Sequence, residues 1–371
     1  MKIAFVVHDY HRLGGHSRYT FELAERFARE HEVHVFANRI EEEGSAPIRF
    51  HRIPALRTTA LTTILSFQIP ATAAIGSGFD VVHAQGLSCF GANVITAHIC
   101  SQTWYESRRS SNDPVRPHEH VFASIVNRAE RALYRRSGNA EIIAVSRLIA
   151  RNLNDAYGRS DRVSVIYHGV DLERFSPSNR ATYRGALRRD LGIPDSALVA
   201  LWVGDLRKGA ITAIDAIADA TGWRLHFVSR TAPDRYIEHA AQRGVSDRVS
   251  FSPHSSRIEE YYAASDAFLF PSAYDAFGMV VTEAMASGIP VLVSRAAGAS
   301  ELVEDGVSGH VLESPHDGAE AARHLNAWSA DRSVLARQGD AARAAVQPYT
   351  WDAIAEQTLA VYERAAKRRK S

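Results

Sequence analysis

The chain has 371 residues, and its 43 basic and 42 acidic residues leave a formal net charge of +1 at pH 7. This balance excludes a general attraction to nucleic acid, and the length exceeds what one ordinary core serves, so two domains are expected. Cys89 and Cys100 are too few for a disulfide framework, which favours a reducing cytoplasmic location.

No stretch of the sequence reaches the roughly 18 apolar residues that a membrane-spanning helix needs. The longest candidate, residues 60–75, is interrupted by Gln68 and Pro70. The apolar residues 3–7 are too few for the core of a signal peptide. We therefore expect no transmembrane segment.

The first half of the chain opens with the pattern of a doubly wound α/β domain. Residues 2–7 form an apolar run that predicts a buried strand, and a polar loop follows that ends in Gly14 and Gly15. An amphipathic helix and a second strand over 33–36 come next, which completes a βαβ unit. Two glycines before a helix allow an anion to approach backbone amides, although a tight turn alone also explains them.

Residues 80–84 and 93–97 predict two further parallel strands, and His98 directly follows the second. The carboxyl end of a strand is where α/β sheets place their ligands. Ordinary hydrogen bonding at a strand end is the alternative for this histidine, one of 17 in the chain.

Seven arginines face four acidic residues between positions 101 and 136. Such a basic region is either a solvated surface or a flap that receives an anionic or membrane-bound substrate. His118 and His120 flank Glu119 but lack further matched ligands, so no metal site is predicted.

The second half restarts the α/β pattern with a predicted strand over 197–203. Arg207 and Lys208 follow it in a short loop, and an alanine-rich helix comes next. An apolar strand over 267–270 then leads through a loop with Asp275 into a helix that contains Glu283. Either Asp275 caps this helix and Glu283 is solvated, or both carboxylates face a polar ligand at the helix N-terminus.

The stretch from 267 to 303 resembles the signature of retaining glycosyltransferase family four. That signature is Glu-x-Phe-Gly followed by a second Glu, and here Asp275 stands at the first Glu while Glu283 matches the second. The segment around Glu301 resembles the Gly-x-x-Glu-x-Val loop that follows. About forty residues therefore match at fixed spacing.

This resemblance implies a GT-B fold, in which two Rossmann-like, doubly wound α/β domains face a central cleft. The segment from His168 to Asp171 resembles the family's linker. The expected N-terminal, acceptor-side domain therefore covers residues 1–171, with a C-terminal helix over 349–366 packing back on it. The donor-side domain is expected over residues 172–348.

The resemblance also implies roles for individual residues. Lys208 would bind the donor diphosphate, helped by Arg207, because Asp205 occupies the position of the family's usual arginine. His98 would lie near the donor sugar, Asp275 would hold the sugar hydroxyls and Glu283 the ribose. The remaining expected donor-binding residues are Gly14, Gly15, Phe277, Gly278, Met279, Val280 and Glu301.

The implied activity is a metal-independent hexosyl transfer with retention, from a UDP- or GDP-linked sugar to an acceptor hydroxyl. The acceptor would be a glycan, a lipid-linked sugar or a small molecule of cell-envelope or natural-product biosynthesis. No cofactor besides the donor is expected. The protein is expected to make at most a weak peripheral contact with the inner face of the membrane. A GT-B nucleotide-sugar epimerase and a non-catalytic nucleotide-sugar binder are the alternatives.

Overall fold

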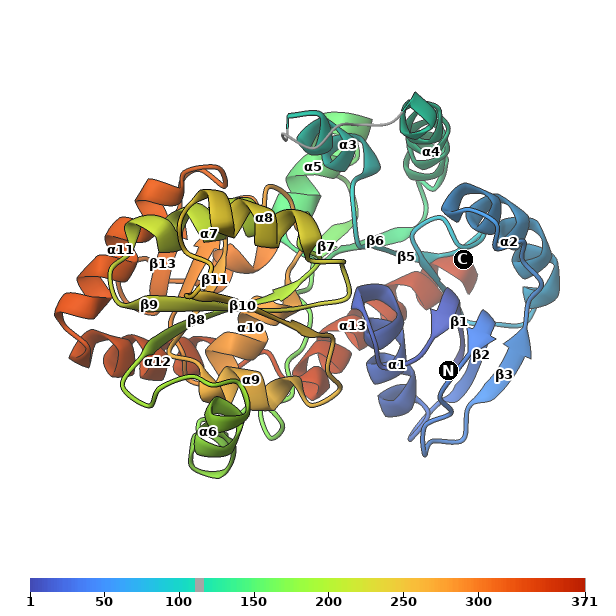
Figure 1. Cartoon of the computed structure of the whole chain (residues 1–371). Helices are drawn as coiled ribbons and strands as arrows, with labels where there is room; N and C mark the ends of the chain where they lie inside the picture. Colours follow the sequence, from blue (N-terminus) through green and yellow to red (C-terminus); the bar gives the residue numbers. More distant parts are fainter. Residues whose placement is uncertain (111–116, 371) are drawn as a thin grey trace. The chain divides into compact units, whose positions relative to one another are not determined.

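The computed structural model describes residues 1–110 and 117–370 (Figure 1). Arg116, one of the arginines of the basic region, lies outside the described residues. The chain divides into unit 1, residues 1–169 with 351–371, and unit 2, residues 170–350.

Unit 1 is built on a parallel sheet with the strand order β3-β2-β1-β4-β5-β6-β7. Its central strands are buried on both faces, which explains their nearly continuous apolar sequences. The edge strand β3 was not predicted, because Arg-Phe-His-Arg has no apolar run. The strands are β1 (Lys2–Tyr10), β2 (Glu32–Ile40), β3 (Arg49–Arg52), β4 (Val81–Gln85), β5 (Val94–Ala97), β6 (Glu141–Ala144) and β7 (Val163–Val165).

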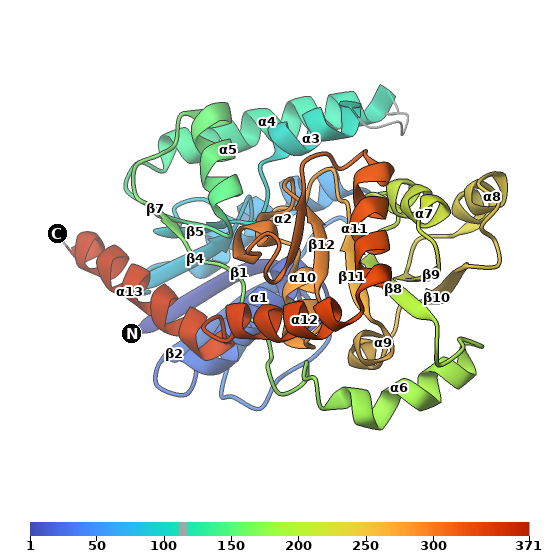
Figure 2. The same cartoon turned by 90° about the vertical axis from the view of Figure 1, so that its left-hand side faces the viewer.

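Helices cover both faces of this sheet. The described helices of unit 1 are α1 (Gly15–Phe27), α2 (Ala60–Ile75), α3 (Ser101–Ser110), α4 (Pro117–Arg136), α5 (Arg147–Tyr157) and α13 (Trp351–Lys370). α13 contacts α1 and strands β4 to β6, while Figure 2 shows α3, α4 and α5 as one layer over the other face. α2 continues through Pro70 as a single helix. The chain passes from β4 to β5 without an intervening helix. This crossover therefore contributes no helix to cover β5.

Unit 2 has a second parallel sheet with the order β10-β9-β8-β11-β12-β13. Its strands are β8 (Leu198–Gly204), β9 (Trp223–Ser229), β10 (Val249–Pro253), β11 (Ala267–Phe270), β12 (Val291–Ser294) and β13 (Gly309–Leu312). β13 pairs with β12 and is the edge strand of this sheet, which was not predicted from the sequence. β13 is short and begins with a glycine, so its sequence shows no strand pattern.

The helices of unit 2 lie on both faces of its sheet, with α7, α8 and α11 on one face and α9, α10 and α12 on the other (Figure 1). They are α6 (Asn179–Asp190), α7 (Ala210–Asp219), α8 (Asp234–Gln242), α9 (Ile258–Ala264), α10 (Met279–Ala286), α11 (Gly318–Ala330) and α12 (Ser333–Val346), with a 3₁₀ turn, η1 (Gly298–Leu302). The two sheets and their helices give each unit the doubly wound α/β pattern expected from the sequence.

One buried carboxylate fastens α6 to the second sheet. Asp266, just before β11, accepts hydrogen bonds from Arg180 at 2.7 Å, Arg184 at 2.8 Å and Arg188 at 2.7 Å. These arginines are four residues apart and so share one face of the helix. The Arg188 side chain is fully buried, and the amide of Val199 in β8 also donates to Asp266.

Replacing Asp266 by alanine should destabilise unit 2 strongly. The change leaves the buried Arg188 guanidinium without its counter-charge, a loss of about 3–5 kcal/mol for buried ion pairs. The matched control is Asp219→Ala, which removes a half-exposed partner of Arg243 and should change stability little. Urea unfolding followed by circular dichroism measures both, and equal effects of the two substitutions would contradict the structural role of Asp266.

Candidate functional site

The candidate site of unit 2 lies where the strand order of its sheet reverses. β8 and β11 are neighbours, and the chain proceeds outward from them in opposite directions. The loops that follow these two strands therefore diverge at a topological switch point, the position where open α/β sheets bind ligands. The first loop carries Arg207 and Lys208, and the second carries Asp275.

The two loops are joined by an ion pair between Lys208 and Asp275. The Lys208 ammonium donates to Oδ2 of Asp275 at 2.7 Å, and the amide of Phe277 donates to Oδ1 at 3.2 Å. The Asp275 charge raises the pKa of Lys208 and outweighs burial, which acts to lower it. The lysine side chain is still 39% exposed, so a protonated cation stays accessible at this edge of the sheet.

A glycine makes this close approach of the loops possible. Gly209 begins α7 with a φ of 104°, and a Cβ atom there would lie 2.1 Å from the carbonyl oxygen of Pro271. Any side chain at Gly209 would force the Lys208 loop away from the Asp275 loop. In the Lys-Gly pair, the glycine thus permits the close packing of the loops, and the lysine supplies the charge.

The helix α10 begins beside Asp275. Its N-cap is Gly278, at a φ of 90°, and this position has no side-chain cap. The interpretation of Asp275 as a helix cap was therefore wrong, since its Oδ1 accepts from Phe277 instead. Within the described chain, no hydrogen bond uses the amides of Gly278, Met279 and Val280. These amides and the helix dipole favour an anion at this point.

Glu283 lies inside α10 and is only 6% exposed, so the alternative that it is solvated was also wrong. Its Oε2 accepts a hydrogen bond from the hydroxyl of Tyr262 at 3.0 Å, and the same hydroxyl lies 3.1 Å from the carbonyl of Val280. Tyr262 was not singled out from the sequence. It lies on a different helix, α9, and a buried tyrosine gives no local signal for such a contact.

Arg207 lies differently from Lys208. Its Nε is 2.9 Å and 3.0 Å from the two carboxylate oxygens of Asp205, and Asp205 also accepts from Thr231. Burial acts to raise the pKa of Asp205, but the hydrogen bonds from Arg207 and Thr231 hold it below its ordinary value. Asp205 therefore neutralises Arg207, the residue that the sequence analysis offered as a replacement for the family's arginine.

The loop that contains Glu301 is hydrogen-bonded to the backbone of Asp275. The backbone amide of Gly298 donates to the carbonyl of Asp275 at 2.9 Å, and Asp275 forms an isolated parallel bridge with Ala297. Glu301 itself lies half-buried in the turn η1. The predicted residues Asp275, Phe277, Gly278 and Glu301 thus belong to one hydrogen-bonded set of loops.

The predicted residues of unit 1 gather at the carboxyl ends of its own strands. Gly14 is the N-cap of α1 and has a φ of 78°, and a Cβ atom on Gly14 or Gly15 would meet nothing within 4 Å. The backbone at this turn is therefore open to a ligand, as the two glycines suggested.

His98 is 6% exposed and follows β5. Burial, then His16 and His168, lower the pKa of His98 well below its ordinary value, so the imidazole is neutral near pH 7. Its Nε2 lies 2.7 Å from Oε1 of Gln85, which only accepts, so Nε2 carries the hydrogen. Nδ1 is then an acceptor, buried and without a partner among the described residues. The ring also stacks on the exposed His16 at 4.3 Å.

Gln85 and His16 were not predicted as members of this cluster. Gln85 ends β4, which pairs with β5, and His16 starts α1, so only the packing of the sheet brings them to His98. In the parts of the chain that the structure describes, no group of three or more His, Cys, Asp or Glu side chains is placed to hold a metal ion. None of the described helices is long and apolar enough to cross a membrane.

Two family descriptions match the chain. "Glycosyltransferase Family 4" matches residues 13–174, and "Glycosyl transferases group 1" matches residues 184–345. D-inositol 3-phosphate glycosyltransferase of Streptomyces bingchenggensis is 33% identical over 258 residues, 62% of this chain and 55% of the relative. The namesake protein of Xylanimonas cellulosilytica is 36% identical over 241 residues, 62% of this chain and 58% of the relative. The match thus spans little more than half the length of these relatives.

Solved structures resemble the whole chain. WaaG, a glycosyltransferase involved in lipopolysaccharide biosynthesis, has a TM-score of 0.81 at 20% identity, over 96% of this chain and 98% of WaaG. Anabaena HepE in complex with UDP and glucose has a TM-score of 0.74 at 23% identity, over 98% and 99% of the two chains. At such identities the likeness concerns the fold, and it confirms the GT-B class expected from the sequence.

Gly209→Ala should destabilise unit 2 beyond the ordinary effect of a left-handed residue. That effect is roughly 1–2 kcal/mol, and the overlap with Pro271 adds to it. Gly222→Ala is the matched control, since Gly222 has a φ of 78° but open space around its Cβ position. Denaturant unfolding of both variants isolates the contribution of the close approach. Equal losses would mean that the loops separate without penalty.

Proposed function

The chain belongs to glycosyltransferase family 4, and we propose from this premise that it transfers a sugar from a nucleoside diphosphate sugar to an acceptor hydroxyl. The observation that carries the proposal is the pair formed by Lys208 and Asp275 at the switch point of unit 2. Next to it lie the unused amides at the start of α10. A cation, a carboxylate and free N–H groups together suit a sugar diphosphate, which presents hydroxyls and negative charge side by side.

The chemistry of the leaving group assigns a task to each of these parts. When the anomeric C–O bond breaks, negative charge grows on the diphosphate, and preorganised donors that face it lower the barrier. Lys208 and the amides of Gly278, Met279 and Val280 supply such donors. The incoming diphosphate would compete with Asp275 for the ammonium, and Asp275 would then accept hydrogen bonds from the sugar hydroxyls.

The other expected roles follow the same division. Glu283, held by Tyr262, would accept the ribose hydroxyls, because one carboxylate can accept two neighbouring O–H donors. His98 would offer its Nδ1 lone pair to a donor hydroxyl. We further propose that the configuration is retained, with the departing diphosphate taking the acceptor proton on the same face of the sugar.

We propose a UDP-linked donor in preference to a GDP-linked one. Support comes from HepE, whose solved complexes contain UDP and UDP-glucose. For the acceptor we propose a small polyol or sugar, free or attached to a lipid. Support comes from the relatives that are named D-inositol 3-phosphate glycosyltransferases.

A single assay separates this function from its alternatives. The protein is incubated with a panel of UDP- and GDP-sugars, with and without inositol phosphate, and nucleotide and sugar products are followed by chromatography. A transferase releases UDP faster when acceptor is present and forms a glycosylated product. An epimerase converts the donor without acceptor, and a non-catalytic binder leaves the donor intact, so either result would refute the proposal.

Transfer should persist when divalent metal ions are removed. Lys208 and the helix amides neutralise the diphosphate by themselves, so chelation with EDTA should leave the rate of UDP release unchanged. Added magnesium or manganese should not accelerate it. A rate that collapses with EDTA and recovers with either ion would overturn this account of the leaving group.

Lys208→Ala should lower kcat by about 100- to 1,000-fold, the usual effect of removing one preorganised donor, while KM changes less. Arg207→Ala is the companion variant, since its guanidinium is already neutralised by Asp205 and its loss should cost far less activity. Steady-state kinetics over a range of donor concentrations gives kcat and KM for both variants. A change in KM alone for Lys208→Ala would assign the lysine to ground-state binding, and equal losses would make Arg207 an active cation.

A further inference from the structure

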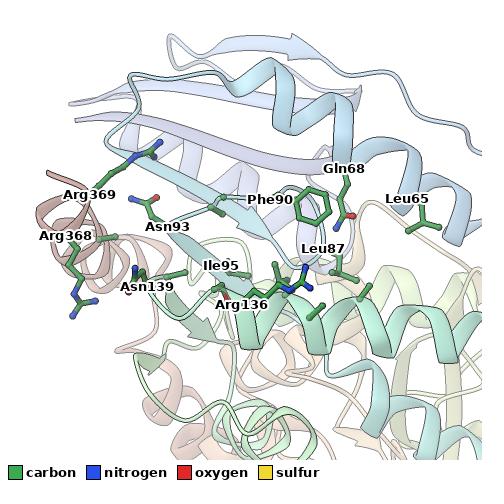
Figure 3. A pocket seen from close by; sticks show the side chains of 18 residues that line it. Leu65, Gln68, Leu87, Phe90, Asn93, Ile95, Arg136, Asn139, Arg368 and Arg369 are labelled. Atoms are coloured by element: carbon green, nitrogen blue, oxygen red, sulfur yellow. The ribbon is translucent and has the colours of Figure 1, made fainter. Parts of the chain in front are cut away.

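Unit 1 contains a cavity of about 1050 Å³ that none of the roles above uses (Figure 3). It lies between α2, α4, the β4–β5 connection and the end of α13. The direct connection of β4 to β5 explains it, because a crossover without a helix leaves a gap over β5 between the flanking helices. The volume is just above the usual range for small-molecule pockets, about 300–1,000 Å³.

The walls of this cavity are mostly apolar. They include Leu65 from α2, Leu87 and Phe90 from the β4–β5 connection, Ile95 from β5 and Leu133 from α4. Leu65 is 44% exposed and Phe90 is 53% exposed, so large apolar surface remains open to solvent at the mouth. Apolar surface gathered in a concave site favours an apolar ligand group.

The lining also carries positive charge. Arg136 ends α4, Arg368 and Arg369 belong to the end of α13, and no acidic residue is among the lining residues. Arg368 pairs with the buried Glu141, whereas Arg136 and Arg369 have no ion-pair partner within the described parts of the chain. Figure 3 shows Arg368 and Arg369 at the end of the cavity opposite to Leu65. Arg136 lies between the two ends in this view (Figure 3), with its side chain directed toward Leu87. The site is therefore apolar at the Leu65 end and has cationic side chains in its middle and at its other end.

Two buried hydrogen-bonding atoms in the lining lack a partner. Gln68 is 5% exposed, and its Nε2 makes no hydrogen bond among the described residues; the same holds for Oγ of Ser137. A buried amide left without a partner is unfavourable, so such a group points to a missing acceptor. Figure 3 shows the Gln68 amide directed into the cavity.

The cavity is separate from the predicted ligand residues of unit 1. Asn93 and Asn139, which line it, come just before β5 and β6, at the amino ends of these parallel strands. Gly14 and His98 come after β1 and β5, at the carboxyl ends. The cavity thus extends from Leu87, just after the carboxyl end of β4, to the amino ends of β5 and β6, and neither Gly14 nor His98 is among its lining residues.

We propose that this cavity binds one acyl lipid with a phosphate monoester head group. The acyl chain would lie along the apolar walls toward Leu65, and Gln68 and Ser137 would donate to ligand oxygens. The phosphate would lie among the arginines, whose planar groups bind phosphate with paired hydrogen bonds. A phosphate monoester carries a charge of about −1.5 to −2, which matches the two arginines that have no counter-charge.

The proposal is tested with three matched probes on the full-length chain. 1-Lauroyl-glycerol 3-phosphate carries both chain and phosphate, monolauroylglycerol lacks the phosphate, and glycerol 3-phosphate lacks the chain. Isothermal titration below the micelle concentration should give one bound lauroyl-glycerol phosphate per chain. Each of the other two probes should bind about tenfold more weakly or worse. Equal binding of monolauroylglycerol or of glycerol 3-phosphate would refute the composite site.

Variants locate the binding in the cavity. Ala132→Trp fills the space beside Leu133, and Gln68→Leu removes the unused donor while keeping a similar size, so both should weaken binding. Arg136→Gln and Arg369→Gln should each weaken it by about tenfold. Arg135→Gln and Lys367→Gln are the matched controls, because they remove neighbouring charges on the same helices that do not line the cavity.

Thermal unfolding of each variant separates binding from folding. If Ala132→Trp unfolds, Gln68→Leu and the arginine variants still decide the question. Equal losses in the control variants, or several lipids bound per chain, would mean adsorption to a basic surface and would overturn the proposal. Because the readout is lipid binding, it does not depend on whether the chain transfers sugar.

Discussion

The contact between Gly209 and Pro271 determines the geometry of the candidate site. Two loops from adjacent strands meet there, and the missing side chain of Gly209 lets them approach closely enough for Lys208 to reach Asp275 at 2.7 Å. The same Asp275 is bound through its backbone to Gly298 and Ala296, which ties the turn of Glu301 to it. The loops that carry the cation, the carboxylate and the helix start are thus fixed relative to one another by backbone contacts, which favours preorganised electrostatic stabilisation.

The two basic residues next to this contact differ in how their charges are neutralised. Of two adjacent basic residues, Arg207 is neutralised locally by Asp205, whereas Lys208 is shared with a carboxylate from another strand. A partly exposed lysine that pairs with a carboxylate of another loop can exchange this carboxylate for an incoming anion. An arginine that is neutralised by a carboxylate of its own loop attracts an incoming anion less strongly. In the proposed function, Lys208 is therefore the cation for the diphosphate, although aspartate stands at the position of the family's arginine.

Unit 1 has two places with different chemistry. At the carboxyl ends, His98 is kept neutral and oriented by Gln85, beside the open glycine turn. Elsewhere in unit 1, the gap left by the direct β4–β5 crossover forms the cavity, which reaches the amino ends of β5 and β6 and carries arginines. The residues that line the cavity include neither the two glycines of the turn nor His98.

The sequence by itself determined the α/β class and the main strands, and it predicted Lys208, Asp275 and Glu283 as members of one site, because apolar runs and motif spacing are local properties. It did not reveal β3 or β13, whose residues lack an apolar run, nor Tyr262 and Gln85, whose contacts cross between elements. Only the tertiary structure decided that Asp275 binds Lys208 instead of capping α10, that Glu283 is buried, and that Arg207 is neutralised. These outcomes depend on strand order and loop packing, which join residues such as Gly209 and Pro271 that lie far apart in the chain.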